Sequence, residues 1–236
     1  MDKSTRIPYK IPTRVRIFRS LLCPVFRGIF HLLAHVRIFG RENVPSKGPY
    51  LITINHVSLF DPPFVIAFWP VAPEAVGAVD IWSRRGQSTL ARLYGGIQAH
   101  RGEYDRKLLD SMQAALQCGY PLLIAPEGRR SHTPGMQRAR QGTAYIVDKT
   151  GVPVVPVGIV GTTGDFIQRA LHGRRPTIEM HIGEAFQLPP VDGKGENRRT
   201  ALLCNIDQIM YQIADQLPPE YRGVYSLPHV PSKTPL

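Results

Sequence analysis

The sequence is poor in cysteine, with three in 236 residues. The three are far apart and odd in number, and no CxxC pair occurs, so the sequence predicts neither a disulfide framework nor a zinc site. So few cysteines fit a reducing compartment, and we expect no metal. The positions are Cys23, Cys118 and Cys204.

The sequence also lacks a long hydrophobic run. No stretch approaches the roughly 18 apolar residues that a helix needs to span a bilayer. The longest uncharged stretch near the N-terminus is GIFHLLAHV, between Arg27 and Arg37. The early arginines also interrupt any signal-peptide core. We therefore expect a protein that is soluble or attached peripherally to the cytoplasmic face of the cell membrane.

Acidic residues are almost absent from the first 41 positions, which contain nine lysines and arginines and one aspartate. This segment accounts for +8 of the formal net charge of +11. Such a balance indicates an anionic partner, which could be a membrane surface, nucleic acid or a phosphorylated substrate. The remaining chain carries only +3 and has no basic stripe interleaved with aromatic residues, so we expect no nucleic-acid binding.

The basic segment also has an amphipathic pattern. Apolar residues between positions 13 and 39 recur at helical spacing, and Pro24 is expected to kink or split the helix. An apolar stripe flanked by arginines is typical of a helix that lies in the plane of an anionic membrane, and the alternative is an ordinary helix packed on a core. We expect a membrane-interfacial segment over 1–40, a globular domain over 41–226 and a flexible tail over 227–236.

Beyond this segment, strand patterns alternate with helix patterns. Such alternation predicts an α/β fold with a mixed, largely parallel sheet flanked by helices. Because it contains prolines, the strand at 152–160 is expected at an edge or to be irregular. Expected strands lie at 50–54, 74–79, 121–125, 152–160 and 177–183, and expected helices at 61–69, 105–119, 138–149 and 197–217.

The stretch NHVSLFD places His56 five residues before Asp61, directly after the apolar run YLITI. Five residues of regular helix would point the two side chains about 140° apart. Because Pro62 disfavours helical angles at Asp61, a bent loop is expected, in which the aspartate folds back onto the imidazole. That contact would fix the tautomer and leave the other nitrogen to accept a proton. The alternative is a helix N-cap beside a surface histidine.

Two further segments carry arginine beside glycine. APEGRRS, at 125–131, follows an expected strand, and a strand end is suited to bidentate contact between arginine and phosphate. GGIQAHRG, at 95–102, would deliver Arg101 to the same anion pocket. Each is also compatible with a charged surface turn. No G-x-S-x-G occurs, so we do not expect a serine hydrolase.

The order of these segments resembles that of the glycerolipid acyltransferases, the 1-acyl-sn-glycerol-3-phosphate acyltransferases and their relatives. The motifs of that family are NHxSxxD, a Gly…Arg segment, PEGTRS and a VPxxPV strand. The corresponding segments here are NHVSLFD, GGIQAHR, PEGRRS and VPVVPV, in the same order. The resemblance extends from about position 37 to position 225, and the first and third motifs together make it specific.

The resemblance implies the transfer of a fatty acyl group from acyl-CoA or acyl carrier protein to the sn-2 hydroxyl of lysophosphatidic acid, without a cofactor. His56 would be the general base and Asp61 would orient it. Arg101 would hold the acceptor phosphate, and the strand of Pro156 would line the acyl or donor side. The positions that match the acceptor site of the family are Arg101, Glu127, Gly128, Arg130 and Arg140.

The sequence departs from the family in two respects. Arg129 stands where threonine is usual, which leaves the acceptor headgroup open: another lysophospholipid, glycerol-3-phosphate or an amino lipid would use the same machinery. The transmembrane anchor of many relatives is also missing, and the basic N-terminal segment would replace it. The remaining alternative is a non-catalytic membrane-binding protein, in which the His/Asp pair is structural.

Overall fold

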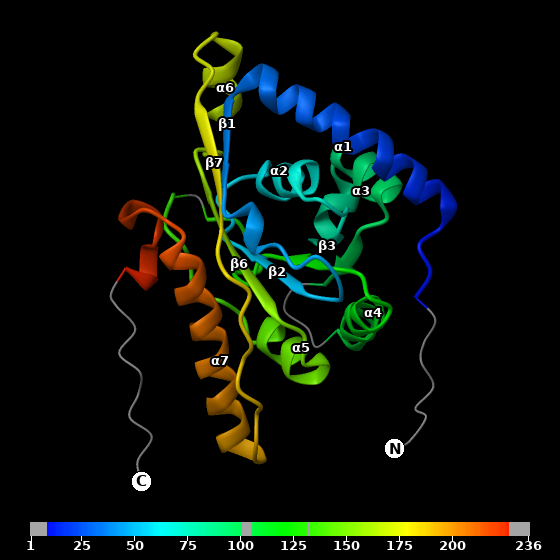
Figure 1. The fold of residues 1–236 in the computed structure, drawn as a ribbon, viewed down its shortest axis with the longest axis vertical. Helices are drawn as coiled ribbons and strands as arrows, with labels where there is room; N and C mark the ends of the chain where they lie inside the picture. Colours follow the sequence, from blue (N-terminus) through cyan, green and yellow to red (C-terminus); the bar gives the residue numbers. More distant parts are fainter. Residues whose placement is uncertain (1–8, 101–104, 132, 227–236) are drawn as a thin grey trace.

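The computed structural model describes residues 9–100, 105–131 and 133–226. These residues form a 7-stranded sheet in the order β1-β7-β6-β2-β5-β3-β4, flanked by helices (Figure 1). Neighbouring strands run parallel except for β6 and β7, which are antiparallel. The predicted α/β fold with a mixed, largely parallel sheet is therefore confirmed.

The strands are β1 (His35–Phe39), β2 (Leu51–Ile54), β3 (Glu74–Ala78), β4 (Ile97–Ala99), β5 (Leu122–Ile124), β6 (Val154–Val160) and β7 (Thr177–Ile182). The α-helices are α1 (Thr13–Leu33), α2 (Asp61–Phe68), α3 (Gln87–Tyr94), α4 (Arg106–Gln117), α5 (Gly142–Thr150), α6 (Phe166–Leu171) and α7 (Gly195–Asp215). Short 3₁₀ turns are η1 (Arg41–Asn43), η2 (Val79–Ser83), η3 (Pro219–Tyr221) and η4 (Gly223–Tyr225).

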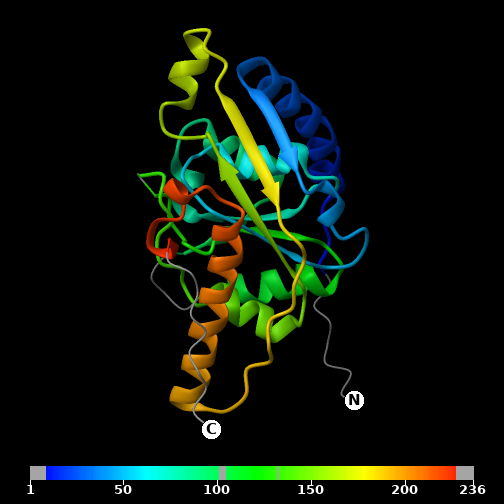
Figure 2. The same ribbon diagram turned by 60° about the vertical axis from the view of Figure 1, so that its left-hand side comes forward.

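Helices cover both faces of the sheet, which is why its central strands are apolar on both sides. One core contains residues of α4, α5 and α7, such as Met112, Ile146 and Ile209. The other core contains residues of α1, α2 and α6, such as Phe30, Phe64 and Phe166. Figures 1 and 2 show α1 and α2 on the opposite side of the sheet from α5 and α7.

The strand β6 lies in the interior of the sheet, between β7 and β2, so the expectation of an edge strand was wrong. Pro156 destabilises the sheet little, because the position of its missing N–H faces β7 and not β2. Its carbonyl accepts from the Gly183 amide at 2.9 Å, just past the end of β7. The nitrogen of a strand residue points to the same side as its carbonyl. The missing N–H therefore lies at the end of the β6–β7 ladder, and the ladder with β2 keeps its donors.

The N-terminal helix is shorter than its pattern predicted. The helix α1 ends at Leu33, Ala34 is extended, and His35–Phe39 forms β1 beside β7. The predicted helix was therefore wrong over 35–39, because an alternating strand also supplies apolar residues at 36 and 38. Pro24 lies inside α1, which continues on both sides of it. Among the described residues, no helix is long and apolar enough to cross a membrane.

Candidate active site

The NHVSLFD stretch forms the bent loop that was predicted between β2 and α2. The helix begins at Asp61 itself, with Phe60 in the cap position, so the alternative in which Asp61 is the helix N-cap is wrong. The Asp61 carboxylate does not cap its own helix. It points back into the loop instead, and it accepts hydrogen bonds from the backbone amides of Val57 at 2.8 Å and Ser58 at 2.7 Å. These two bonds fix the bend that brings His56 to Asp61.

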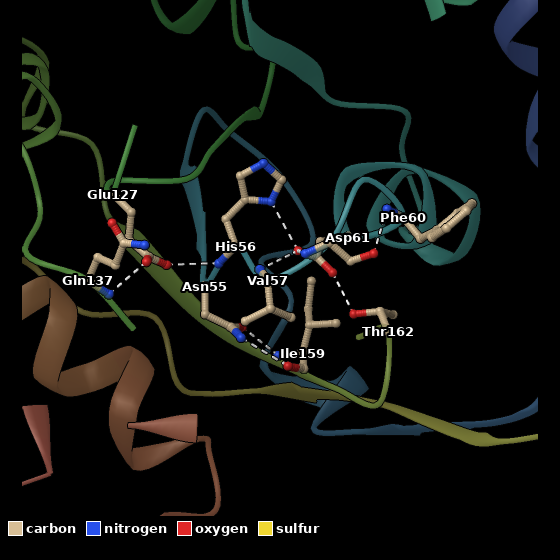
Figure 3. A network of polar contacts seen from close by, with 10 residues as sticks. Asn55, His56, Val57, Phe60, Asp61, Glu127, Gln137, Ile159 and Thr162 are labelled. Carbon is tan, nitrogen blue, oxygen red and sulfur yellow. Dashed lines mark hydrogen bonds and ion pairs between the residues drawn. The ribbon is translucent and has the colours of Figure 1, made fainter. Parts of the chain in front are cut away.

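His56 and Asp61 are in direct contact. The His56 Nδ1 atom lies 3.0 Å from Asp61 Oδ2, and the Thr162 hydroxyl donates to Asp61 Oδ1 at 2.5 Å (Figure 3). Asp61 is fully buried, whereas the His56 side chain is 17% exposed. With Nδ1 directed at the carboxylate, Nε2 is the nitrogen left to exchange a proton with a bound molecule. The arrangement has the geometry of a general base oriented by an acid.

Asn55 anchors the loop to the sheet. Its side-chain amide donates to the Ile159 carbonyl at 2.9 Å and accepts from the Ile159 amide at 2.7 Å. The chain leaves the ladder after Ile54, and the Asn55 side chain replaces the backbone pairing that β2 would have made with β6. The histidine therefore follows directly on a rigid, buried residue.

Glu127 lies behind His56 and is 1% exposed. One carboxylate oxygen accepts from the His56 amide at 2.8 Å and the other from the Gln137 amide at 2.7 Å (Figure 3). Burial raises the pKa of Glu127 to about 7, and the two amide donors oppose that shift. The carboxylate joins the His56 loop to the loop that follows β5, and Glu127 is not among the residues that line the cavities described next.

Two cavities of opposite character meet at His56. One, of about 440 Å³, has mainly apolar walls, including Val76, Leu108 and Met112. The other, of about 910 Å³, has four arginines in its walls. His56 lines both cavities. The site can thus receive an apolar group and an anionic group on two sides of one basic nitrogen.

The other predicted residues are divided between the two cavities. Arg130 and the unusual Arg129 line the basic cavity, whereas Gly128 and Arg140 line the apolar one. Gly128 has a φ of +68°, and a Cβ there would lie 3.0 Å from Arg140 Cδ, so these two positions are packed together. The strand of Pro156 lines neither of these two cavities, and its place on the acyl or donor side stays a prediction. The predicted Arg101 lies outside the described residues.

Several residues of the site lie outside the motifs. Thr162 and Gln137 hold the pair or its loop, and Arg84 and Arg138 line the basic cavity. Asn55 belongs to NHVSLFD, but the sequence did not predict that it would anchor the loop. Among the described residues, no group of three His, Cys, Asp or Glu side chains is placed to hold a metal ion.

A second pair with the same H-x4-D spacing lines the apolar cavity. His100 Nδ1 lies 2.9 Å from Asp105 Oδ2, but the His100 side chain is 57% exposed. Asp105 also caps α4, accepting from the Leu108 amide at 3.0 Å, and this bond is the main reason that its pKa is lowered. The spacing alone therefore does not identify the base; burial of the aspartate and contact with both cavities favour His56.

Comparison with known proteins gives a consistent result. A family model described as Acyltransferase matches residues 35–160. A Chlamydomonas reinhardtii protein described as a 1-acyl-sn-glycerol-3-phosphate acyltransferase is 29% identical over 203 residues, which cover 80% of this chain and 54% of that protein. A Borreliella burgdorferi protein with the same description is 23% identical over 159 residues, covering 64% and 62%. The chain thus spans between about half and three fifths of these curated relatives.

A solved structure shares the fold. The crystal structure of the 1-acyl-sn-glycerophosphate (LPA) acyltransferase PlsC from Thermotoga maritima matches with a TM-score of 0.59 and 23% identity. The match covers 83% of this chain and 79% of that one.

Proposed function

Because the chain belongs to the Acyltransferase family, we propose that it transfers a fatty acyl group from acyl-CoA or acyl carrier protein to the sn-2 hydroxyl of lysophosphatidic acid. The product would be phosphatidic acid, an intermediate of phospholipid biosynthesis. The observation that carries this proposal is the position of His56, paired with a buried aspartate at the junction of an apolar and a basic cavity. The two curated relatives are described by the same activity.

The reaction needs one base and no covalent enzyme intermediate. His56 Nε2 takes the proton from the acceptor hydroxyl, and the oxygen attacks the carbonyl carbon of the thioester. The tetrahedral intermediate then expels the thiolate, which takes the proton from the imidazolium as the ester forms. Asp61 keeps Nδ1 protonated and stabilises the imidazolium between the two transfers.

The two cavities provide for the two substrates. An acyl chain is favourably buried against apolar walls such as those of α4. A phosphate is favourably bound by arginine, which offers two parallel N–H donors. We therefore place the acyl chain in the 440 Å³ cavity and the acceptor phosphate near Arg130 in the 910 Å³ cavity. Other lysophospholipids, glycerol-3-phosphate and amino lipids remain alternative acceptors, and Arg101 remains a predicted phosphate ligand.

We also propose that α1 holds the enzyme at an anionic membrane surface on the cytoplasmic face. One face of α1 packs on the domain through Val15, Arg19 and Phe30. The opposite face exposes a stripe of apolar side chains, each between 44% and 74% exposed. Arg14, Arg16 and Arg27 of the same helix are exposed, and a basic side chain contributes about 1 kcal/mol near an anionic surface. The stripe, here called the α1 stripe, consists of Ile17, Leu21, Val25, Ile29 and Leu32.

The proposal is tested by measuring acyl transfer from long-chain acyl-CoA and acyl carrier protein to lysophosphatidic acid and to a panel of other lysolipids. His56→Ala should lower kcat by about 10²–10⁴-fold. His172→Ala changes an exposed histidine at the end of α6 and should leave the rate unchanged. Activity on a different lysolipid only would correct the acceptor. A wild-type rate in His56→Ala would refute the catalytic role and favour a non-catalytic membrane-binding protein.

A further inference from the structure

The basic cavity carries more positive charge than one phosphate requires. Its arginines come from two separate parts of the chain. Arg84, directly after η2, faces it from one part, and Arg129, Arg130 and Arg138, on the loop after β5, face it from the other. Asp80 is the one acidic residue among the described residues that line the cavity. Four guanidinium groups therefore surround this space together with one carboxylate.

Arg129 is held in place by the same network that holds His56. Its Nε atom donates to the side-chain oxygen Oε1 of Gln137 at 2.6 Å. The backbone amide of Gln137 donates to the Glu127 carboxylate. Glu127 in turn accepts from the His56 amide. The bond to Gln137 uses Nε, so the two terminal nitrogens of Arg129 remain available for an anion. The arginine that replaces the family's threonine is thus positioned relative to the base.

The charge balance indicates what the cavity binds. A phosphate monoester carries about −1.5 to −2 at pH 7, and a single arginine already binds a phosphate through two parallel hydrogen bonds. Among the described residues, four arginines against one aspartate leave a formal excess of three positive charges around this space. In so large a cavity, two neighbouring phosphates would each find an arginine pair.

We propose that this cavity binds a portion of a substrate that bears at least two phosphate groups. Binding of two phosphates does not depend on the function proposed above. Only the identity of the substrate that carries these phosphates rests on that function. One source is the diphosphate of a CoA thioester, which a carrier-protein donor lacks because its arm has a single phosphodiester. The other is an acceptor lipid with a second phosphate in its headgroup.

The first experiment measures binding without catalysis. Titration calorimetry at low ionic strength compares inorganic pyrophosphate with inorganic phosphate as ligands of the full chain. Pyrophosphate should bind about 10-fold more tightly or better, because it engages a second charged group. Arg84→Ala and Arg129→Thr should each weaken pyrophosphate binding by about 5-fold or more and affect phosphate less. Equal affinity for the two anions would overturn the proposal.

The chain offers a matched control for charge alone. Arg85 is exposed and adjacent to Arg84, but it does not line the cavity. Arg85→Ala removes the same formal charge, so it should leave the preference for pyrophosphate intact. A loss in Arg85→Ala as large as in Arg84→Ala would mean that general surface charge attracts the anion, and the proposal would be wrong.

The second experiment identifies the source by steady-state kinetics of wild type and Arg129→Thr. A KM that rises for acyl-CoA but not for acyl carrier protein assigns the site to the donor. A KM that rises for a two-phosphate lysolipid but not for lysophosphatidic acid assigns it to the acceptor. A KM unchanged for every substrate contradicts the proposal. If no acyl transfer occurs at all, the proposed function fails while the anion-binding result stands by itself.

Discussion

The hydroxyl of Thr162 donates a 2.5 Å hydrogen bond to the Asp61 oxygen that faces away from His56. Both Thr162 and Asp61 are fully buried. Thr162 is placed there by the turn after β6, where Gly161 has a φ of +86° and a Cβ would lie 2.2 Å from the Thr177 carbonyl oxygen. The aspartate is therefore held from both sides, by the loop amides and the histidine on Oδ2 and by the threonine on Oδ1.

Thr162→Val replaces the hydroxyl by a methyl group of similar size and leaves Asp61 Oδ1 buried without this donor. Hydrogen bonds to charged groups contribute about 1.5–3 kcal/mol, so we expect kcat to fall by about 10- to 100-fold with KM nearly unchanged. Thr162→Ser keeps the hydroxyl and should restore most of the rate. Steady-state kinetics and the pH profile of kcat/KM measure the effect.

The adjacent Thr163 provides the control for this substitution, because its hydroxyl bonds to the exposed Asp165 instead. Thr163→Val should keep the wild-type rate. If Thr162→Val lowers the melting temperature while the folded enzyme keeps its kcat, Thr162 supports the fold and does not position Asp61.

The raised pKa of Glu127 predicts how stability depends on pH. In the native protein the carboxyl releases its proton near pH 7, whereas in the unfolded chain it does so near its ordinary value of 4.5. Between these values the native state binds more protons, so the free energy of unfolding falls as pH rises. The shift corresponds to about 3 kcal/mol across this window. Below pH 4.5 the contribution is fully present, and it is lost above pH 7.

Glu127→Gln removes this titration, so the stability advantage of wild type over the variant should shrink as pH rises from 4.5 to 7. Urea denaturation at several pH values measures the difference, in which the contributions of other groups cancel. Glu184→Gln changes an exposed glutamate and serves as the reference variant under the same conditions. A difference between wild type and Glu127→Gln that stays constant with pH would show that the pKa of Glu127 is ordinary in the native state.

The sequence could predict those parts of the site in which the reacting side chains lie close together in the chain. The sequence placed NHVSLFD in a bent loop after the strand YLITI, and a bent loop does bring His56 to Asp61. The bend lies before Asp61, where the Val57 and Ser58 amides bond to its carboxylate, and not at Pro62, because Asp61 is already helical. The support of this pair comes from residues about 100 positions away, at Ile159 and Thr162. Threonine in a glycine-rich turn has no distinctive spacing, so only the placement of β6 beside β2 reveals it.

The errors in the fold have similar causes. Val36 fits the helical stripe, but pairing with β7 decided in favour of a strand. Pro153 and Pro156 suggested an edge or irregular strand. The sequence does not show that the missing N–H of Pro156 faces the end of β7, because that direction is set by the neighbouring strands. Glu127 matched an acceptor-site motif, yet its carboxylate is turned toward backbone amides of two loops.

A buried ion pair ties α1 to the sheet. Arg19 contacts the carboxylate of Glu74 on β3 through both terminal nitrogens, and its Nε donates to the Tyr94 carbonyl at 2.9 Å. Both charged residues are buried. Arg19→Met would leave the Glu74 charge without its cation, and we expect the free energy of unfolding to fall by about 3–5 kcal/mol. Chemical denaturation measures the change.

Two further variants show whether the lost stability comes from the uncompensated charge of Glu74 or from the lost packing of Arg19. In Arg19→Met combined with Glu74→Gln the uncompensated charge is gone, so part of the lost stability should return. Arg16→Met changes an exposed arginine of the same helix and should have little effect. If the double variant is as unstable as Arg19→Met, packing of the arginine matters more than the ion pair.

The α1 stripe predicts how the protein binds membranes. Leu21→Glu combined with Leu32→Glu places two carboxylates among the exposed apolar side chains and leaves the buried face of α1 unchanged. Each substitution removes apolar burial in the lipid and adds repulsion from anionic headgroups. We expect binding to vesicles of phosphatidylglycerol and phosphatidylcholine to weaken by about 10-fold or more, measured by co-sedimentation.

Leu203→Glu combined with Cys204→Glu is the matched control, because both side chains are exposed on α7, on the other side of the sheet from α1. It adds the same two negative charges to the chain, so any loss of binding that depends on net charge alone would appear here too. We expect it to bind as wild type does, and the wild type to prefer phosphatidylglycerol at low salt because of the basic side chains beside the stripe. Equal weakening by both changes would show that α1 makes no specific contact with the bilayer. If the α1 variant binds vesicles as well as wild type does, the membrane-contacting surface lies elsewhere on the protein.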